Sequence, residues 1–276
     1  MKIRDIDIDP ALILAPMEGV TDLTFRRLIR QIGGCGLTVT EFIPANGLTH
    51  DAPKCLRMAQ FDEDESPVAI QIYGRDPELM GEAARYVTDL GPDIIDLNMG
   101  CPSKRVCQRS GGSALMKEPQ QARKIIAAMR AATELPFTVK MRAGWDPENK
   151  NAPEIAQMCE EEGVEAVTVH WRTRADGYGG ERELDTIAQV VDRVSIPVIA
   201  NGDILDVDSA RDTLRRTGAD GLMIGRGAIR NPWVFEQIRR DQLGLAPLHV
   251  SLDERERILL GYYDALRTTF RSDKGA

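Results

Sequence analysis

Eight short apolar segments, each followed by a stretch with helical periodicity, organise this sequence of 276 residues. None of the segments exceeds seven residues, and most lack an alternation of apolar and polar residues. This pattern is typical of strands that are buried on both faces of a parallel sheet. Because it recurs eight times with helices between, it predicts an α/β protein with a (β/α)8 TIM barrel. The expected strands are Leu12–Glu18, Leu37–Ile43, Val68–Gly74, Ile94–Gly100, Phe137–Arg142, Ala166–Trp171, Pro197–Asp203 and Gly221–Arg226.

The stretches between these strands carry helix start and stop signals. Asp22 precedes an amphipathic segment as an N-cap, and Gly163 follows Glu154–Glu162 where a helix would end. An open doubly wound sheet is the alternative architecture, but it is less favoured because no GxGxxG motif follows a predicted strand. We expect a barrel domain over residues 1–243 and a short C-terminal helical segment over 244–276, with one helix at Leu252–Phe270.

Composition excludes several classes of protein. No run of 18 apolar residues exists, and the N-terminus lacks the apolar core of a signal peptide, so neither a membrane span nor secretion is expected. The five cysteines are scattered without a CxxC pair, which indicates a reduced, cytoplasmic protein. No cluster has metal-ligand spacing, so no metal is expected. The net charge of −8 argues mildly against a nucleic-acid partner, although a total hides local patches.

One stretch, Ile94–Lys104, places a thiol where a strand gives way to a loop. The apolar run ends in Asn98, Gly100, Cys101 and Pro102, at the end of a strand where ligands bind in parallel α/β folds. The loop from Ser103 to Gly111 is basic, with Lys104, Arg105 and Arg109. A thiol in such a loop is a better reactive candidate than one in an apolar run. Cys107 is the competing thiol, but it does not lie at a strand end.

The other predicted strand ends form a polar and cationic ring. Gly202 and Gly225 end the seventh and eighth strands, where barrels bind phosphate, and Arg226 adds a cation. Lys140 lies between apolar neighbours on a strand. Two functional roles are open to it: it could form a Schiff base, or it could stabilise negative charge on a cofactor ring. The structural alternative is that its side chain extends from the strand end so that the ammonium group reaches water. His170 has a structural and a catalytic interpretation. The amides of Gln71 and Asn201 suit the polar edge of a flavin or pyrimidine.

These motifs together resemble the bacterial flavin-dependent tRNA-dihydrouridine synthases, most closely their B subgroup. Asn98-x-Gly100-Cys101-Pro102 followed by Gly112-Ser113-Ala114 is highly specific, and the motifs run in order from residue 12 to about 235. The other matching motifs are Ala15–Asp22, Gln71–Gly74, Val139–Arg142, His170–Arg174, Ile199–Ile204 and Met223–Gly227.

The resemblance implies a barrel with FMN across its mouth, reduced by NADPH. It places the catalytic cysteine at Cys101. Candidates for holding the edge of the uracil are Asn98, Arg142 and Arg172. By position, the family's FMN contacts fall on Pro16, Met17, Glu18, Gln71, Lys140, His170, Asn201, Gly202, Asp203, Gly225 and Arg226.

The implied reaction is reduction of uridine to 5,6-dihydrouridine in the D-loop of tRNA. Hydride passes from FMN N5 to C6 of a base turned out of its stack, and Cys101 supplies the proton to C5 as general acid. Rim cations for tRNA phosphates would be Lys104, Arg105, Arg109, Arg172 and Arg174. Residues 244–276 are expected to be the start of the family's tRNA-binding helical domain, which is longer than this segment.

Three other functions remain open from the sequence. One is a flavin barrel that acts on free pyrimidines or dihydroorotate, and another is a catalytically inactive tRNA-binding module. The third is a flavin-free aldolase that uses Lys140 as a Schiff base. The presence of both Cys101 and Lys140 argues against an inactive module.

Overall fold

The computed structural model describes residues 1–108 and 111–272, so Arg109 lies outside the described residues. Its parallel strands close into a barrel, because the order β4-β3-β11-β10-β9-β8-β7-β6 returns on itself through pairing of β4 with β6. The prediction of a (β/α)8 barrel is confirmed. The strands are β1 (Lys2–Ile3), β2 (Ile6–Asp7), β3 (Leu12–Leu14), β4 (Leu37–Val39), β5 (Ile43–Pro44), β6 (Val68–Tyr73), β7 (Ile94–Met99), β8 (Phe137–Arg142), β9 (Ala166–His170), β10 (Val198–Asn201) and β11 (Gly221–Ile224).

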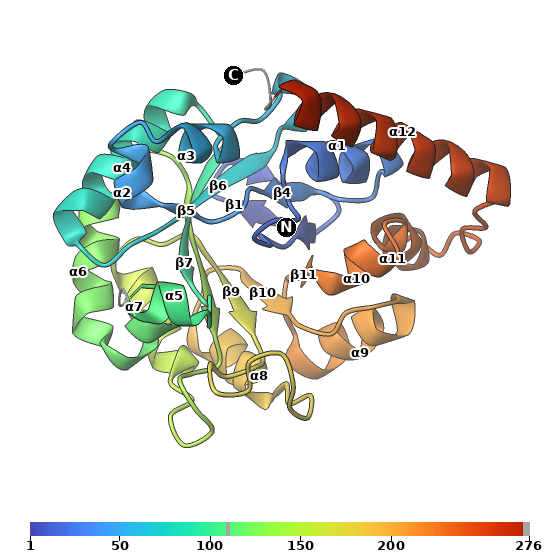
Figure 1. The fold of residues 1–276 in the computed structure, drawn as a ribbon. Helices are drawn as coiled ribbons and strands as arrows, with labels where there is room; N and C mark the ends of the chain where they lie inside the picture. Colours follow the sequence, from blue (N-terminus) through green and yellow to red (C-terminus); the bar gives the residue numbers. More distant parts are fainter. Residues whose placement is uncertain (109–110, 273–276) are drawn as a thin grey trace.

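Helices surround the barrel on its outer side (Figure 1). Asp22 caps α1 by accepting from the Phe25 N–H, as its position before the amphipathic segment predicts. The α-helices are α1 (Leu23–Ile32), α2 (Ala45–Leu48), α3 (Pro53–Met58), α4 (Pro77–Leu90), α5 (Lys104–Gln108), α6 (Pro119–Arg130), α7 (Ala152–Glu161), α8 (Asp185–Arg193), α9 (Val207–Thr217), α10 (Arg226–Arg230), α11 (Val234–Gln242) and α12 (Leu252–Ser272), and the 3-10 turns are η1 (Glu63–Glu65) and η2 (Gly112–Lys117).

Several strands are shorter than the apolar pattern predicts. The segment predicted as Leu12–Glu18 is a strand only to Leu14, and Leu37–Ile43 divides into β4 and the short β5. The residues after these strands turn into the loops of the barrel mouth. The loop predicted after Cys101 also contains a helix, α5. Periodicity over so few residues does not reveal it.

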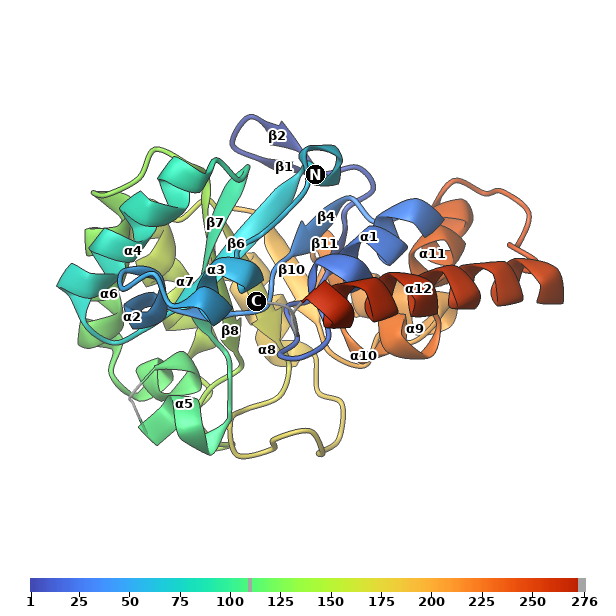
Figure 2. The ribbon, with the colours of Figure 1, turned by 45° about the horizontal axis from the view of Figure 1, so that its top comes forward.

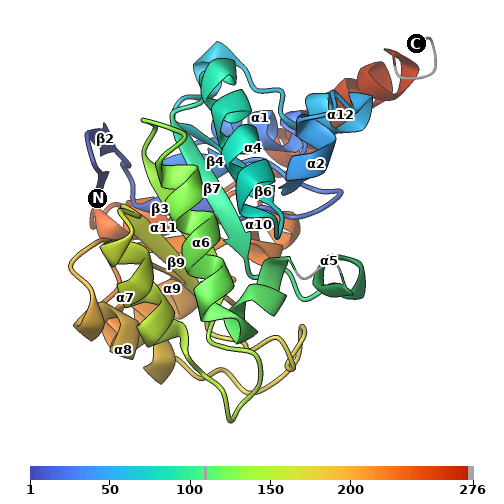
Figure 3. The same ribbon diagram turned by 90° about the vertical axis from the view of Figure 1, so that its left-hand side faces the viewer.

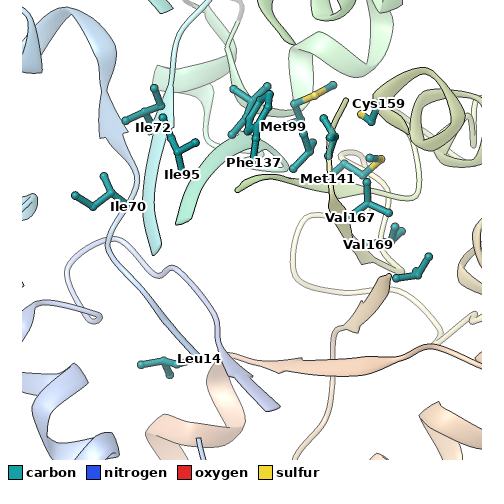
Figure 4. Close-up of a cluster of buried hydrophobic side chains, with 14 of the residues drawn as sticks. Leu14, Ile70, Ile72, Ile95, Met99, Phe137, Met141, Cys159, Val167 and Val169 are labelled. Atoms are coloured by element: carbon teal, nitrogen blue, oxygen red, sulfur yellow. The ribbon is translucent and has the colours of Figure 1, made fainter. Parts of the chain in front are cut away.

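Alternation along each strand separates two apolar clusters. Side chains such as Ile72, Met141 and Val169 face outward and pack beneath the helices, as Figure 4 shows for part of this cluster. The alternate residues Ile13, Ala69, Ile94, Ala166, Ile199 and Met223 form a smaller cluster inside the barrel. Inward-facing residues further along the strands, such as Asn98 four positions after Ile94 on β7 and Lys140 two positions after Thr138 on β8, therefore project into the barrel mouth.

An antiparallel hairpin, β1–β2, lies at the N-terminal end of the barrel, opposite α5 (Figure 3). Ile3 and Ile8 are fully buried and belong to the interior cluster, so the hairpin closes this end of the barrel. The hairpin is not predicted from the sequence, because two-residue strands are too short to show a period.

The C-terminal segment packs against the barrel through α12, which lies along α1 (Figure 2). Tyr262 meets Phe25 edge-on with ring centroids 6.1 Å apart, and Ile258 is buried. Leu252, Leu259 and Tyr263 of the same helix are exposed. Within the described residues, no helix is both long and apolar enough to cross a membrane.

Candidate active site

A cavity of about 400 Å³ opens at the carboxyl ends of the barrel strands. Its wall combines apolar side chains, among them Ala15, Met17 and Met223, with a set of polar and cationic groups. The cavity brings together most of the site residues predicted from the sequence. Those that line it are Pro16, Met17, Glu18, Asn98, Cys101, Lys140, Arg142, His170, Asn201, Gly202, Asp203, Gly225 and Arg226.

Strand register places the polar residues of the cavity side by side. Asn98 of β7 pairs with Lys140 of β8, and Arg142 of β8 pairs with His170 of β9. His170 in turn pairs with Asn201 of β10. Since alternate residues of a strand share one face, these side chains form one continuous polar layer above the apolar barrel interior.

The Lys140 ammonium group is bonded to an amide and not to a carboxylate. Its Nζ donates to Oδ1 of Asn201 at 2.9 Å, and no ion pair to it is found among the described residues. Asn201 is oriented for this role, because its amide donates to the Met223 carbonyl at 2.8 Å. Burial and, to a lesser extent, the nearby Arg142 guanidinium lower the pKa of Lys140 to about 8, while Asp96 opposes the shift. The group is therefore mostly charged at neutral pH, and an electron-rich ligand would stabilise it.

The Cys101 thiol lies in a loop that is anchored on both sides. Oδ1 of Asn98 accepts from the backbone N–H of Cys101 at 2.9 Å, and the Ser113 hydroxyl donates to the Cys101 carbonyl at 2.9 Å. Burial raises the pKa of Cys101, although hydrogen bonds from Ser103 oppose the shift. The thiol thus stays protonated at neutral pH and is available as an acid.

Arg142 reaches into the cavity from β8 and is held by three carbonyl groups. Its Nε donates to Gly100, and its Nη1 donates to Thr173 and Gly177. Among the described residues, none accepts a hydrogen bond from Nη2. Arg142 thereby ties the loop of the cysteine to the loop after β9 and keeps one donor for a ligand.

His170 is neutral at physiological pH. Burial, together with the surrounding cations Lys140, Arg142, Arg172 and Arg226, lowers its pKa well below the ordinary value. Arg172 lies with Nη1 3.4 Å from His170 Nε2, and a guanidinium only donates, so Nε2 is the acceptor. The imidazole is consequently suited to hydrogen bonding and not to delivering a proton at neutral pH.

Asp203 joins two arginines at the end of β10. Its carboxylate accepts from Arg172 Nη2 at 2.8 Å and from Arg226 Nη2 at 2.7 Å. The preceding Gly202 has φ +115°, a conformation that L side chains rarely adopt. A Cβ there would come within 2.5 Å of the Trp171 ring and 2.6 Å of the His170 ring.

Replacing Gly202 by alanine should therefore distort the cavity. We expect a fall of roughly 5 °C in the unfolding midpoint from backbone strain and crowding, and weaker retention of a bound ligand. Thermal unfolding of the variant measures the effect. Gly179→Ala is the control, since its added Cβ meets nothing closer than 3.7 Å and its φ is ordinary. Equal midpoints for the two variants would contradict the argument.

Two predicted site residues do not line the cavity. Gln71 is completely buried, and its amide bonds to Asp96 and Asn98. Arg172 is 4% exposed and is occupied by the Gly179 carbonyl and Asp203. Its guanidinium also stacks on Trp171 with 4.1 Å between Cζ and the ring centroid.

Several residues that line the cavity are not predicted from the sequence. Tyr178 lines it from the long loop after β9, with the Arg226 guanidinium 5.9 Å from its ring. Phe42 also lines it and packs edge-on against Tyr73. No signal marks Tyr178, which lies eight residues beyond its strand, whereas Phe42 lies within the predicted strand Leu37–Ile43, one residue before its end.

The loop of the cysteine is also tied across the cavity. Arg105 of α5 pairs with Glu18 after β3, so the predicted rim cation is neutralised by a predicted cofactor residue. In the described part of the chain, no group of three or more His, Cys, Asp and Glu residues could hold a metal ion.

Fold and site define a (β/α)8-barrel protein with a cationic, thiol-bearing ligand cavity at the C-terminal mouth. The family model for dihydrouridine synthases matches residues 13–275. The chain therefore belongs to the dihydrouridine synthase family, whose members are flavin-dependent oxidoreductases.

Individual relatives agree over almost the whole chain. The tRNA-dihydrouridine synthase B of Pseudomonas syringae pv. tomato is 45% identical over 272 residues, which cover 98% of this chain and 80% of the relative. That of Klebsiella pneumoniae is 44% identical over 278 residues, covering 100% and 86%. A probable tRNA-dihydrouridine synthase of Rickettsia conorii is 42% identical over 268 residues, covering 96% and 81%.

Proposed function

We propose that this chain reduces uridine to 5,6-dihydrouridine in the D-loop of tRNA, with FMN as cofactor and NADPH as reductant. The observation that carries the proposal is one cavity holding an ammonium group that forms no ion pair with the described residues, Lys140, and a protonated thiol, Cys101. The ammonium group of Lys140 would stabilise a redox cofactor that becomes negatively charged when it is reduced. The thiol of Cys101 would supply the proton that the substrate ring needs. The chain's membership of the family supports the assignment.

The cavity residues fit a flavin. Apolar groups such as Met17 and Met223 suit the faces of its ring system, and Asn201 and Lys140 suit its polar edge. Arg226 and the turn at Gly202, which has no side chain, suit its phosphate. The remaining proposed FMN contacts are Pro16, Glu18, Gln71, His170, Asp203 and Gly225. Gln71 is the least direct of these, because its side chain lies outside the cavity lining.

Proton delivery is assigned to Cys101. The chemistry that a bound flavin supplies is hydride transfer to C6 of the uracil ring. The Cys101 thiol then gives its proton to C5 of the same ring, and its raised pKa keeps the proton available until that moment. Asn98 and Arg142 hold the uracil edge, while Arg172 contributes by fixing Asp203 and the loop after β9.

The surrounding surface is assigned to tRNA. Lys104, the first residue of α5, and Arg174, in the loop after β9, lie at the same barrel end as the cavity, where phosphates of a folded RNA would pass. We assign residues 1–243 to the catalytic barrel and 244–276 to a helical segment that contacts tRNA, because α12 leaves Leu252, Leu259 and Tyr263 exposed. All five cysteines are free thiols, as suits the cytoplasm.

The experiment that tests this function is a spectrum followed by a turnover assay. The purified protein should take up FMN, lose the oxidised flavin absorbance on anaerobic addition of NADPH, and regain it when unmodified tRNA is added. Dihydrouridine in the recovered tRNA completes the test. Failure to bind FMN would refute the proposal, and reduction of free uracil or dihydroorotate without tRNA would favour the alternative substrate class.

The charge on Lys140 gives a second, pH-dependent prediction. Lys140→Met should weaken FMN binding by about tenfold to a hundredfold, the effect of losing a hydrogen bond from a charged group. In the unaltered protein, FMN affinity should fall as pH rises through about 8, because the ammonium loses its proton there. Fluorescence titration between pH 6 and 9 measures both. Lys124→Met on the exposed side of α6 is the control, and a pH slope that survives in Lys140→Met would contradict the prediction.

A further inference from the structure

A line of side-chain hydrogen bonds crosses three strands just outside the cavity lining. It begins on β8, where the Thr138 hydroxyl donates to Oδ1 of Asp96 at 2.5 Å. The other carboxylate oxygen, Oδ2, accepts from Nε2 of Gln71 on β6 at 2.6 Å. Asp96 is 4% exposed and Gln71 is not exposed at all. Neither side chain can therefore meet a substrate directly in this arrangement.

The other end of the line reaches the backbone of the reactive cysteine. Oε1 of Gln71 accepts from Nδ2 of Asn98 at 2.7 Å. Oδ1 of Asn98 then accepts from the N–H of Gly100 at 3.1 Å and from the N–H of Cys101 at 2.9 Å. Asp96 is thus connected to the Cys101 loop through two amides.

The groups at the two ends of this line, the Cys101 N–H and the Asp96 carboxylate, determine which group donates and which accepts in every hydrogen bond between them. A backbone N–H only donates, so the oxygen of Asn98 must face Cys101 and its NH2 must face Gln71. The oxygen of Gln71 must then face Asn98, and its NH2 must face residue 96. Asp96 meets that requirement, because an ionised carboxylate only accepts.

The electrostatic surroundings keep Asp96 ionised at neutral pH. Burial raises its pKa to about 6, against the hydrogen bonds from Thr138 and Gln71 and the attraction of Lys140. Lys140 of β8 is the charged side chain that acts on it from the neighbouring strands. The buried carboxylate is therefore stabilised mainly by the bonds of this line.

We propose that Asp96 and Gln71 are positioning residues for Cys101, acting through Asn98 to hold the loop that aims the thiol into the cavity. The inference rests on the proposed function in one respect, which is that the proposed function makes Cys101 the proton donor. The role of Gln71 is not limited to direct contact with a bound ligand, since both the oxygen and the nitrogen of its side-chain amide are already hydrogen-bonded, to Asn98 and to Asp96. The line also fixes Asn98, which itself lines the cavity.

A charge swap tests this directional line. In Gln71→Glu, two carboxylates face each other where Gln71 and Asp96 are bonded in the unaltered protein, and Asn98 is pulled out of place. In the double variant Gln71→Glu/Asp96→Asn, the new amide at position 96 donates to the new carboxylate at position 71 and still accepts from Thr138. That carboxylate still accepts from Asn98, so every bond of the line is restored with the charge moved to the neighbouring side chain. Asp96→Asn alone also preserves the line, because the Thr138 hydroxyl can accept instead of donate.

Two readouts need neither cofactor nor substrate. We expect the unfolding midpoint to fall by roughly 10 °C in Gln71→Glu, and to lie within a few degrees of the unaltered protein in Asp96→Asn and in the double variant. Alkylation of Cys101, followed by peptide mass spectrometry, should accelerate severalfold in Gln71→Glu and return to normal in the double variant. Cys107 in the same loop is the internal reference.

Turnover supplies the third readout. Gln71→Glu should lower kcat for tRNA at least tenfold with little change in KM, and the double variant should recover most of the loss. A double variant no better than Gln71→Glu, or unchanged Cys101 reactivity in Gln71→Glu, would overturn the proposal. If Gln71→Glu does not fold but the double variant does, the line is supported. If the unaltered protein fails to reduce tRNA, the proposed function fails, while the midpoint and alkylation results still decide the positioning role.

Discussion

Replacing Cys101 by alanine is expected to slow the oxidation of the reduced enzyme by tRNA by about 10²- to 10⁴-fold, the contribution of a well-placed general acid. Reduction by NADPH should proceed normally, because the thiol is not needed for that half of the reaction. FMN should also remain bound, since the cations and amides of the cavity are unchanged. Stopped-flow absorbance with NADPH and then tRNA separates the two half-reactions. Undiminished dihydrouridine formation by Cys101→Ala would remove Cys101 from the mechanism.

Cys107→Ala is the matched control for this experiment. Cys107 lies six residues away on α5, and its Sγ is 3.5 Å from the Cys101 carbonyl and 3.4 Å from the Ser113 hydroxyl. Its thiol does not line the cavity, so turnover should stay within about threefold of the unaltered protein. A large loss in Cys107→Ala together with an active Cys101→Ala would exchange the roles of the two thiols.

The protonation state of Cys101 predicts how the rate of the same half-reaction changes with pH. Burial raises the pKa of Cys101, so the thiol remains protonated through neutral pH. The rate of oxidation by tRNA should therefore stay level near pH 7 and fall only as pH rises past the ordinary range of a thiol. A rate that instead rises with pH through this range would indicate that the thiolate is the active form.

The sequence predicts the barrel and much of the cavity for one physical reason. A strand places alternate residues on one face, so Lys140 and Arg142 on β8, or Asn98 after Asp96 on β7, project to the same side wherever the strand lies. Since parallel strands of a barrel end at one mouth, side chains from different strands meet there without any knowledge of packing. The cavity-lining residues from β7 to β11 follow from this argument.

The remaining features depend on contacts that periodicity does not encode. Tyr178 reaches the cavity through the path of a loop, which no local pattern specifies. Gln71 lies at a predicted site position, but its amide is turned to Asp96 and Asn98, a choice set by hydrogen-bond partners on the neighbouring strand. Arg172 similarly follows its strand end, yet Asp203 and the Gly179 carbonyl hold it within the wall.

The buried ion pair of Arg26 and Glu65, which lies away from the cavity, is expected to contribute strongly to the stability of the fold. Both side chains are 1% exposed, and Arg26 Nε lies 2.5 Å from Glu65 Oε1. The guanidinium also donates to the carbonyls of Thr21 and Gln60, and Glu65 accepts from the Thr38 hydroxyl of β4. The pair thus ties α1 and η1 to the barrel wall, and the ion pair itself is shielded from water.

Arg26→Met should lower the free energy of unfolding by about 3–5 kcal/mol, because it leaves the Glu65 carboxylate buried without its cation. For a chain of this size the loss corresponds to roughly 10 °C in the unfolding midpoint. Removing both charges in Arg26→Met/Glu65→Leu should recover much of the lost stability, since apolar side chains often replace a buried ion pair at little cost.

Arg27→Met is the matched control, one residue along α1. Arg27 is 57% exposed and pairs with Asp62, so its loss should cost less than about 1 kcal/mol. Equal midpoints for Arg26→Met and Arg27→Met would show that burial does not set the strength of these pairs.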